Sequence, residues 1–279
     1  MSQRLLVNCP DRPGIVARVT TFLAERGANI LDLDQHSDVQ DARFAMRVVY
    51  AADARDRERI REQFGSVAAD LRMQYHFASA DTQPPVAILC SREDHCLLDL
   101  LWRFDSGELQ GTPALVASTV DDHRAKVDGF GLPYETVPVT SEGGMPEHES
   151  RLLELLAGRV ELVVLARYMR ILSAAFLQAL GCPAINIHHS FLPAFAGADP
   201  HARAHDRGVK LIGATAHYVT AELDAGPIIE QDVVRVTHRH DTDDLRRIGR
   251  DVERVVLARA VRAHLEDRVV TWGERTVVF

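Results

Sequence analysis

Asn186 and His188 could act together on a carbonyl group, and both lie in an apolar stretch at residues 184–193. Side chains alternate between the two faces of an extended strand, so Asn186 and His188 would project from one face and the neighbouring isoleucines from the other. Pro193 would stop regular strand pairing soon after them. The sequence therefore predicts an amide donor and an ionisable ring at the end of a strand, where open α/β sheets bind their ligands.

A carboxylate that completes this set is predicted at Asp224, in the turn-like sequence Leu-Asp-Ala-Gly-Pro at residues 223–227. An amide, an imidazole and a carboxylate together can polarise a carbonyl group, stabilise an oxyanion and move a proton. We therefore expect Asn186, His188 and Asp224 to form one catalytic site.

The composition favours a protein that acts on a small molecule. Of 279 residues, 46% are apolar and 26% charged, which is ordinary for a globular chain with room for two domains. The formal net charge is −8 with no block of basic residues, which argues against nucleic acid or an anionic membrane as the main partner. No apolar run approaches the roughly 20 residues that span a bilayer, and the first residues form a strand pattern rather than a signal peptide, so we expect a cytoplasmic protein.

Residues 1–80 have the element order βαββαβ, which predicts a ferredoxin-like domain. Strand patterns occupy residues 4–8, 29–35, 43–50 and 71–77, with one helix after the turn at residues 10–14 and a second at residues 56–64. Gly27 closes the first helix. Small sheets of this kind leave an apolar face or edge that often pairs with a second copy, so we expect a homo-oligomer, either a dimer or a tetramer.

A polar, proline-bearing linker at residues 81–85 leads into a second domain at residues 86–279. Short apolar strands alternate with helices there, which predicts an α/β fold with a Rossmann-like, mostly parallel sheet. The longest helix is expected at residues 242–265, where apolar side chains recur at helical spacing. Residues 269–279 should form a terminal hairpin that turns at Gly273.

The pattern Asn-x-His with a downstream Leu-Asp-x-Gly-Pro-Ile resembles the active-site signature of the formyltransferases that use 10-formyltetrahydrofolate. The longer sequences at residues 186–197 and 208–215 resemble the deformylase branch of that family, formyltetrahydrofolate deformylase. Cys-Pro-Asp-Arg-Pro-Gly-Ile-Val at residues 9–16, followed by Gly-Ala-Asn-Ile at residues 27–30, resembles an ACT domain. The resemblance covers nearly the whole chain.

This resemblance implies hydrolysis of 10-formyltetrahydrofolate to tetrahydrofolate and formate, with formate supplied for purine synthesis and no cofactor. Asn186 would donate its amide to the oxyanion, and His188 would stabilise that charge and donate a proton. Asp224 would pair with the imidazole and orient or deprotonate the attacking water. His217 matches a family histidine near the catalytic carboxylate and would support it.

A folate pocket is implied at residues 164–173, which resemble the family segment whose backbone binds the pterin ring. Its expected members are Arg167, Met169, Arg170, Ile171 and Leu172, with Gly226 on the opposite wall. The apolar members could equally be plain core.

His189 would point away from His188 on a regular strand, which favours a structural role for it.

A small-molecule effector, such as an amino acid, is implied for the ACT-like domain, because ACT domains often bind one at the turn after the first strand, commonly across a dimer interface. The expected ligand-binding residues are Asp11, Gly14 and Asn29. The alternative is that residues 10–14 only form a turn and a helix cap.

Two features distinguish hydrolysis from transfer to an amine. Glycinamide ribonucleotide transformylase, a relative, has a glycine-rich loop after its first strand that holds a phosphate. Residues 91–96 of this chain contain no glycine and two carboxylates, which leaves water as the acceptor. Ser118-Thr119-Val120 departs from the deformylase pattern and leaves contacts to the folate tail open. The alternatives are transfer of the formyl group to an unidentified amine, or an inactive folate- and amino-acid-sensing scaffold.

A metal is not expected. His201 and His205 are four residues apart and His238 and His240 two apart, so each pair could present two ligands on one face. The chain has no His-Glu-x-x-His motif, and its four cysteines include no Cys-x-x-Cys pair.

Overall fold

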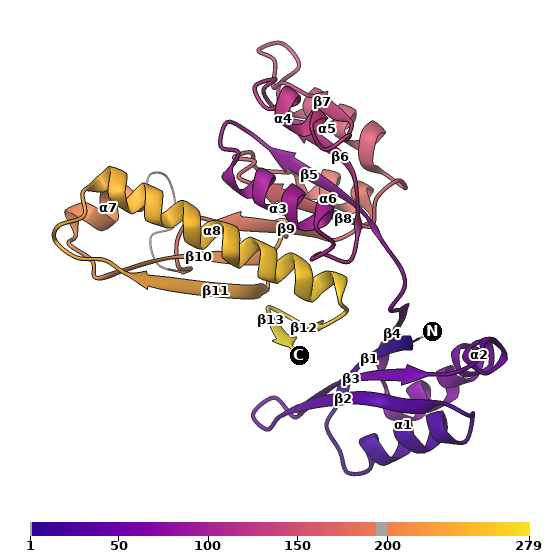
Figure 1. Ribbon diagram of the computed structural model, residues 1–279. Coiled ribbons are helices and arrows are strands. Elements are labelled where there is room, and N and C mark those ends of the chain that lie inside the picture. The colour runs from indigo at the N-terminus through magenta and orange to yellow at the C-terminus, as the bar shows by residue number, and fades with distance from the viewer. Residues whose placement is uncertain (1, 194–199) are drawn as a thin grey trace. The chain divides into compact units, whose positions relative to one another are not determined.

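The computed structural model describes residues 2–193 and 200–279, and it divides into two compact units (Figure 1). Unit 1 comprises Met1–Thr82 together with Glu266–Phe279, and unit 2 comprises Gln83–Leu265. The boundary between Thr82 and Gln83 lies in the linker expected at residues 81–85. The expectation that residues 86–279 form one domain is wrong for the terminal segment Glu266–Phe279, which packs with unit 1.

Unit 1 has the predicted order βαββαβ. Its sheet has the strand order β2-β3-β1-β4 with antiparallel neighbours, and its two helices bury one face. The core of that face includes Val19, Leu23, Ile60 and Phe64 from the helices, all fully buried. The elements are β1 (Ser2–Pro10), α1 (Ile15–Ala24), β2 (Asn29–Asp38), β3 (Arg43–Ala51), α2 (Ala54–Leu71) and β4 (Gln74–Ser79).

The other face of this sheet is covered by the terminal hairpin, β12 (Val269–Trp272) and β13 (Arg275–Val278), which turns at Gly273 as expected. Because side chains alternate along β1, Leu5 and Val7 face the helices while Leu6 packs with Val270 and Trp272. Arg4 also reaches the hairpin segment, with its Nη1 3.1 Å from Oδ2 of Asp267. Both faces of the sheet are therefore buried.

Unit 2 contains a seven-stranded sheet with the strand order β11-β10-β9-β8-β5-β6-β7. The strands from β9 to β7 run parallel, while β10 and β11 are antiparallel additions at one edge. The mostly parallel α/β fold is confirmed. The elements are β5 (Pro85–Cys90), α3 (His95–Asp105), β6 (Thr112–Ser118), α4 (Arg124–Asp128), β7 (Tyr134–Thr136), α5 (Gly144–Leu156), β8 (Leu162–Ala166), α6 (Ala174–Leu180), β9 (Ala184–His188), α7 (Pro200–Asp206), β10 (Leu211–Tyr218), β11 (Ile228–Arg235) and α8 (Thr242–Leu265).

The strand order reverses between β5 and β8. From β5 the chain moves outward to β6 and β7, then returns to add β8 and β9 on the other side of β5. Loops that leave the carboxyl ends of strands at such a switch point diverge and open a crevice, which is where α/β sheets bind ligands. The segments after β5, β8 and β9 are therefore the part of the fold that can hold a substrate.

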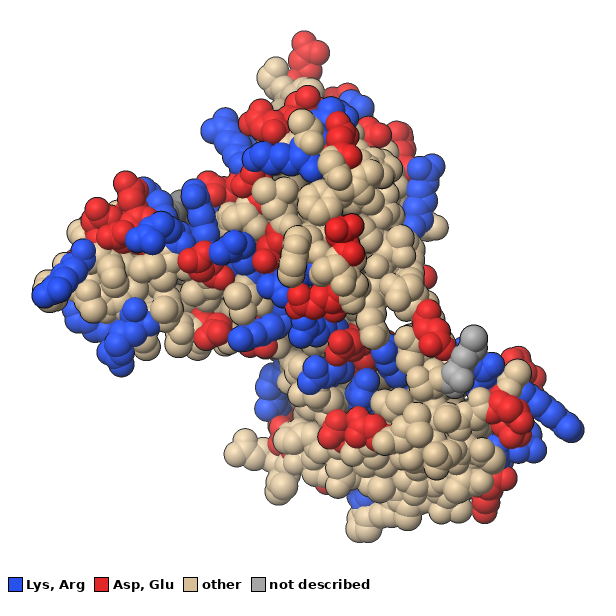
Figure 2. All heavy atoms as spheres, viewed as in Figure 1, with Lys and Arg blue, Asp and Glu red and all other residues tan. Residues whose placement is uncertain are grey.

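The long helix α8 has the bounds predicted from its periodicity and packs against the sheet through Val256, Leu257 and Val261, all fully buried. Its exposed side carries ion pairs such as Arg246–Asp243 and Arg254–Asp251. Positive and negative side chains accordingly alternate along this helix (Figure 2). In the part of the chain that the structure describes, no helix is both long enough and apolar enough to cross a membrane.

Candidate active site

The pairing of β9 with β10 brings Asn186 and His217 together. The two residues are partners in the antiparallel ladder, and Nδ2 of Asn186 lies 3.3 Å from Nε2 of His217. Nδ1 of His217 lies 2.9 Å from the carbonyl oxygen of Tyr218. Because a carbonyl can only accept, Nδ1 carries a proton, and Nε2 is the ring nitrogen that faces the Asn186 amide.

Asp224 joins the two histidines. Its Oδ2 lies 3.2 Å from Nδ1 of His188, and its Oδ1 lies 3.7 Å from Nε2 of His217. The carboxylate comes from the loop after β10, where Asp224 itself has a positive φ of 54°. Backbone in this sparsely populated region is held by its surroundings and is common at functional sites. The structure thus brings Asn186, His188, His217 and Asp224 into one cluster.

Gly226 fixes the position of this loop. A Cβ atom at Gly226 would lie 1.8 Å from the carbonyl oxygen of Tyr218, so only glycine allows the loop to approach β10 so closely. The amide of Tyr218 donates to the carbonyl of Pro227 at 3.0 Å. Gly226 was expected on the folate-pocket wall, but its visible role is to hold the Asp224 loop.

The electrostatics of the cluster keep Asp224 ionised. The hydrogen bond from His188 and then the nearby His217 ring lower the pKa of Asp224 well below its usual range, against the opposing effect of burial. His188 is 6% exposed, and its Nε2 has no hydrogen-bond partner within residues 2–193 and 200–279. Because Asp224 accepts from Nδ1, Nε2 is the ring nitrogen of His188 that keeps its hydrogen-bonding capacity.

A buried hydrogen-bond cluster holds the chain just after β9. Thr215 is fully buried; its Oγ1 donates to the carbonyl of Ser190 at 2.9 Å and accepts from the amide of Leu192 at 3.0 Å. Gln231 donates to the same Oγ1 at 2.9 Å and to the carbonyl of Leu192 at 3.1 Å. These contacts position the end of β9, and sequence analysis did not identify Thr215 or Gln231.

A cavity beside the cluster is lined by both polar and apolar side chains. Asn186, His217 and Asp224 line its polar side, and Arg170 with the apolar Ile171 and Leu172 lines the other. Its remaining walls are formed by Leu165, Val219, Thr220, Ala221, Glu222 and Leu223. Three of the expected folate-pocket residues are therefore next to the catalytic cluster.

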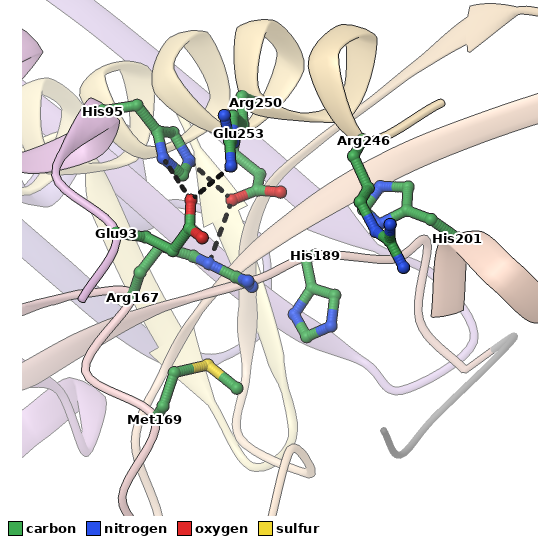
Figure 3. Close-up of a pocket in the computed structure, with 9 residues that line it drawn as sticks. All are labelled: Glu93, His95, Arg167, Met169, His189, His201, Arg246, Arg250 and Glu253. Atoms are coloured by element: carbon green, nitrogen blue, oxygen red, sulfur yellow. Dashed lines mark hydrogen bonds and ion pairs between the residues drawn. The ribbon is translucent and has the colours of Figure 1, made fainter. Parts of the chain in front are cut away.

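Arg167 and Met169 lie elsewhere. Both have positive φ, 62° and 57°, which turns their side chains into a second cavity, drawn in Figure 3. Tyr168, between them, is 1% exposed and is anchored by hydrogen bonds to His148 and Ser91. The αL turns therefore divide the side chains of residues 167–172 between two cavities.

His189 does not point away from His188 as expected. The two rings are stacked, with centroids 5.3 Å apart and an interplanar angle of 26°. The alternation of side chains fails here because β9 ends at His188. On its far side, the His189 ring stacks with that of His201 at 6.0 Å. His189 therefore packs against one face of the His188 imidazole.

Comparison with known proteins agrees with this arrangement. Residues 85–261 match the family model described as formyl transferase, and residues 3–69 match the ACT domain model. A formyltetrahydrofolate deformylase of Mycobacterium tuberculosis is 55% identical over 280 residues, which cover 99% of this chain and 90% of that protein. The chain belongs to the formyltetrahydrofolate deformylase family.

Among solved structures, a deformylase matches the whole chain and a transformylase matches part of it. A formyltetrahydrofolate deformylase from Pseudomonas syringae matches with a TM-score of 0.94 and 45% identity, covering 100% of this chain and 94% of that chain. A glycinamide ribonucleotide transformylase from Symbiobacterium toebii matches with a TM-score of 0.68 and 31% identity, covering 72% of this chain and 96% of that chain. The match to the deformylase extends over both units, whereas the match to the transformylase does not.

The turn after β5 in this deformylase-family chain is built around side-chain contacts. Nε2 of His123 binds the carbonyl of Ser91 at 2.8 Å, and Arg250 pairs with Glu93 at 2.9 Å. Thr119 donates to Oγ of Ser91 at 3.1 Å. The segment Ser118-Thr119-Val120, which departs from the deformylase sequence pattern, thus supports the turn that follows β5.

The residues expected to bind an effector in the ACT domain do not meet within one chain. Pro10, next to Asp11, pairs with Arg43 at one end of β3, whereas Asn29 pairs with Ala51 at the other end. The reason is that α1 carries the chain back along the sheet before β2 begins. Gly14, with a φ of 91°, is the N-cap of α1 on the Asp11 side.

One cluster has the donor types of a metal site. Among the described residues, ligand atoms of His95, Cys96 and Glu253 lie within 4.8 Å of one another. Nε2 of His95 already lies 2.9 Å from Oε2 of Glu253, and the Arg167 guanidinium lies 3.4 Å from the same oxygen. Burial raises the pKa of the Cys96 thiol well above its usual value. A cation would therefore compete with Arg167 and need an unfavourable thiolate.

Proposed function

We propose that this chain hydrolyses 10-formyltetrahydrofolate to tetrahydrofolate and formate, as its named relatives do. The observation that carries the proposal is the His188–Asp224 pair at 3.2 Å. The other ring nitrogen of His188 has no partner among the described residues, and Asn186 and Asp224 line the neighbouring cavity. In this proposal the pterin lies against Ile171 and Leu172, and the formyl group reaches His188.

The reaction adds a water oxygen to the formyl carbon and breaks the carbon–nitrogen bond. The carbonyl oxygen becomes an oxyanion, which the Asn186 amide and protonated His188 stabilise. His188 then donates a proton to the departing nitrogen, and a proton of the attacking water replaces it. The other water proton leaves when formic acid ionises, so the products are the free amine, formate and one proton.

Asp224 acts here as an orienting group. Because its neighbours lower its pKa, its carboxylate is a weak base and is poorly suited to remove a proton from water. Its hydrogen bond to Nδ1 places Nε2 of His188 toward the substrate and stabilises the imidazolium. The same carboxylate can accept a hydrogen bond from the attacking water and so direct its oxygen at the formyl carbon.

The test is to incubate purified protein with 10-formyltetrahydrofolate and measure release of tetrahydrofolate and formate, beside the His188→Ala variant. Turnover in the wild type and its loss in the variant is the expected result. Transfer of the formyl group only when an amine is added would assign the chain to the transferases. Folate binding without turnover in either protein, even after a screen of amino-acid effectors, would identify an inactive scaffold.

We further propose that the ACT domain binds an amino-acid effector only in a homo-oligomer, because Asp11 and Asn29 lie at opposite ends of one sheet. Two copies could place Asp11 of one chain beside Asn29 of another. Sedimentation measurements with and without each amino acid, together with turnover, test this. A monomer whose rate responds to an amino acid would contradict it.

A further inference from the structure

The second cavity is separate from the cleft proposed for the pterin and occupies about 210 Å³. Its walls come from the turn after β5, the segment after β8, the end of β9 and the buried side of α8 (Figure 3). The lining residues are Glu93, His95, Arg167, Met169, His189, His201, Arg246, Arg250 and Glu253. Apart from His189, which stacks on His188, these side chains have no part in the proposed catalytic cycle.

Both carboxylates of the cavity already have partners. Glu253, 2% exposed, lies 2.9 Å from Nε2 of His95 and 3.4 Å from Nε of Arg167. Glu93 is 2.9 Å from Arg250 and 3.7 Å from Nδ1 of His95. These four contacts are the dashed lines in Figure 3. The negative charges of the wall are therefore neutralised, while three arginines line it.

Arg167 keeps unused hydrogen-bonding capacity. Its Nη1 is buried and has no hydrogen-bond partner in the described part of the chain. A buried donor without a partner is costly, and a guanidinium in particular satisfies two donors at once with a planar carboxylate. The positive φ of 62° at Arg167 holds this side chain in the cavity rather than in the folate cleft. The wall thus offers a buried cationic donor to a small planar anion.

His189 connects this site with the reacting centre. Its ring stacks on that of His188 at 5.3 Å and also lines the cavity. Burial, and then the charge of Arg167, lowers the pKa of His189 to about 3, so the ring is neutral at physiological pH. The neutral ring of His189 therefore gives the cavity wall one hydrogen-bond donor and no charge.

We infer that this cavity receives formate from the Asn186–His188–Asp224 site, with the guanidinium of Arg167 as its principal ligand. Formate is the smallest planar carboxylate, and it is released next to His189. The inference rests on the proposed hydrolysis for the source of the anion; the site itself rests on Nη1 of Arg167, which has no hydrogen-bond partner among the described residues. A carboxylate site beside the cluster would draw the product away from the nucleophilic amine it has just left.

Binding of sodium formate to the purified full-length protein tests the site without any turnover. Saturation-transfer NMR on the formate proton should give a dissociation constant of about a millimolar, as expected for a three-atom ligand. Arg167→Met should weaken binding about tenfold or more, because it removes a charge-assisted bidentate contact. Tetrahydrofolate affinity should change less than about twofold, since Arg167 faces the other cavity.

Two further variants make the outcome specific. Arg92→Met removes an exposed arginine from the same turn without changing the cavity wall, and formate affinity should stay the same. Glu253→Gln removes the carboxylate that competes for Arg167 while preserving its shape, so formate should bind more tightly. Circular dichroism and thermal unfolding establish that each variant is folded.

The inference is overturned if formate binds equally well to the wild type and Arg167→Met, or if it does not bind the wild type at all. Equal affinity for acetate would assign the site to a general carboxylate and overturn its assignment to the product. Loss of hydrolysis with retained formate binding would count against the proposed function alone, so the two failures are distinguishable.

Discussion

The two carboxylate oxygens of Asp224 have different tasks. Oδ2 holds His188 at 3.2 Å, and Oδ1 faces His217 at 3.7 Å. Asp224→Asn keeps the size of the side chain but removes its negative charge and one of its two acceptor oxygens, so the imidazolium loses its electrostatic stabilisation. We expect turnover to fall by about two to four orders of magnitude with a much smaller change in KM. Steady-state kinetics on 10-formyltetrahydrofolate measure this, and a near-normal kcat would remove Asp224 from the mechanism.

The buried ring of His189 should make the folded state sensitive to acid. Its pKa in the folded protein is lowered to about 3 by burial and Arg167, whereas an unfolded chain binds the proton near pH 6.5. The contribution of this ring to stability is therefore complete above about pH 6.5 and is lost as the pH falls toward 3. His189→Phe keeps the stacking on His188 and cannot bind a proton.

Urea titrations at pH 7 and pH 5 test this expectation. The wild type should lose on the order of 1 kcal/mol more stability between these two pH values than His189→Phe does. His205→Phe, which removes an exposed histidine on α7, serves as the control and should follow the wild type. If the free energy of unfolding depends on pH identically in the wild type and His189→Phe, the pKa of His189 is not lowered in the folded protein.

The proximity of Asn186, His188 and Asp224 could be predicted from the sequence because a short strand alternates its faces and because the flanking motif is distinctive. The placement of Arg167, Met169 and His189 could not. It depends on positive φ values at Arg167 and Met169 and on β9 ending at His188. Neither feature has a signal in residue types, since non-glycine residues rarely adopt the αL conformation.

At the level of elements, the loop between β10 and β11 determines the position of the Asp224 carboxylate. Gly226→Ala would place a methyl group 1.8 Å from the carbonyl oxygen of Tyr218, and backbone cannot yield as a side chain can. The loop must therefore move away from β10 and take Asp224 with it. We expect kcat to fall about 100-fold, the typical cost of a displacement of about 1 Å in a catalytic group.

Gly65→Ala is the matched control for this substitution. Gly65 lies within α2 of unit 1, where a Cβ would meet only the Tyr75 hydroxyl at an ordinary 3.7 Å. This change should leave kcat unaffected and should slightly raise the stability, since alanine favours helix. If Gly226→Ala retains wild-type kcat, the close approach of the loop is not needed for catalysis.

Element boundaries followed the apolar pattern where that pattern was long. The helix at residues 242–265 was predicted with the observed bounds of α8, because its apolar side chains recur over many turns. The helix predicted at residues 56–64 runs in fact over Ala54–Leu71, with Val67, Ala68 and Leu71 extending its buried face. Gly65 inside the helix makes the pattern look finished too early.

At the scale of the whole molecule, the chain ends in the unit where it began. The hairpin β12–β13 completes the core of unit 1, although it follows the last helix of unit 2 in sequence. Sequence analysis predicted the hairpin and its turn at Gly273 but assigned it to the second domain, because proximity along the chain was the available guide. Contacts such as Trp272 with Leu6 and Ala45 join distant segments, and no local pattern predicts which sheet a terminal hairpin will cover.

Trp272→Ala tests this organisation, because Trp272 is 7% exposed and packs with Leu6, Ala45 and Val270. Removing a buried tryptophan costs about 3–5 kcal/mol, and the loss should fall on unit 1. In hydrogen exchange followed by mass spectrometry, we expect faster exchange in β1 and β3, with β8 and β9 unchanged. Val278→Ala, at a side chain 43% exposed on the same hairpin, is the control and should exchange like the wild type. Faster exchange in β8 and β9, with β1 and β3 still protected, would show that the hairpin stabilises unit 2, as its position in the sequence suggests.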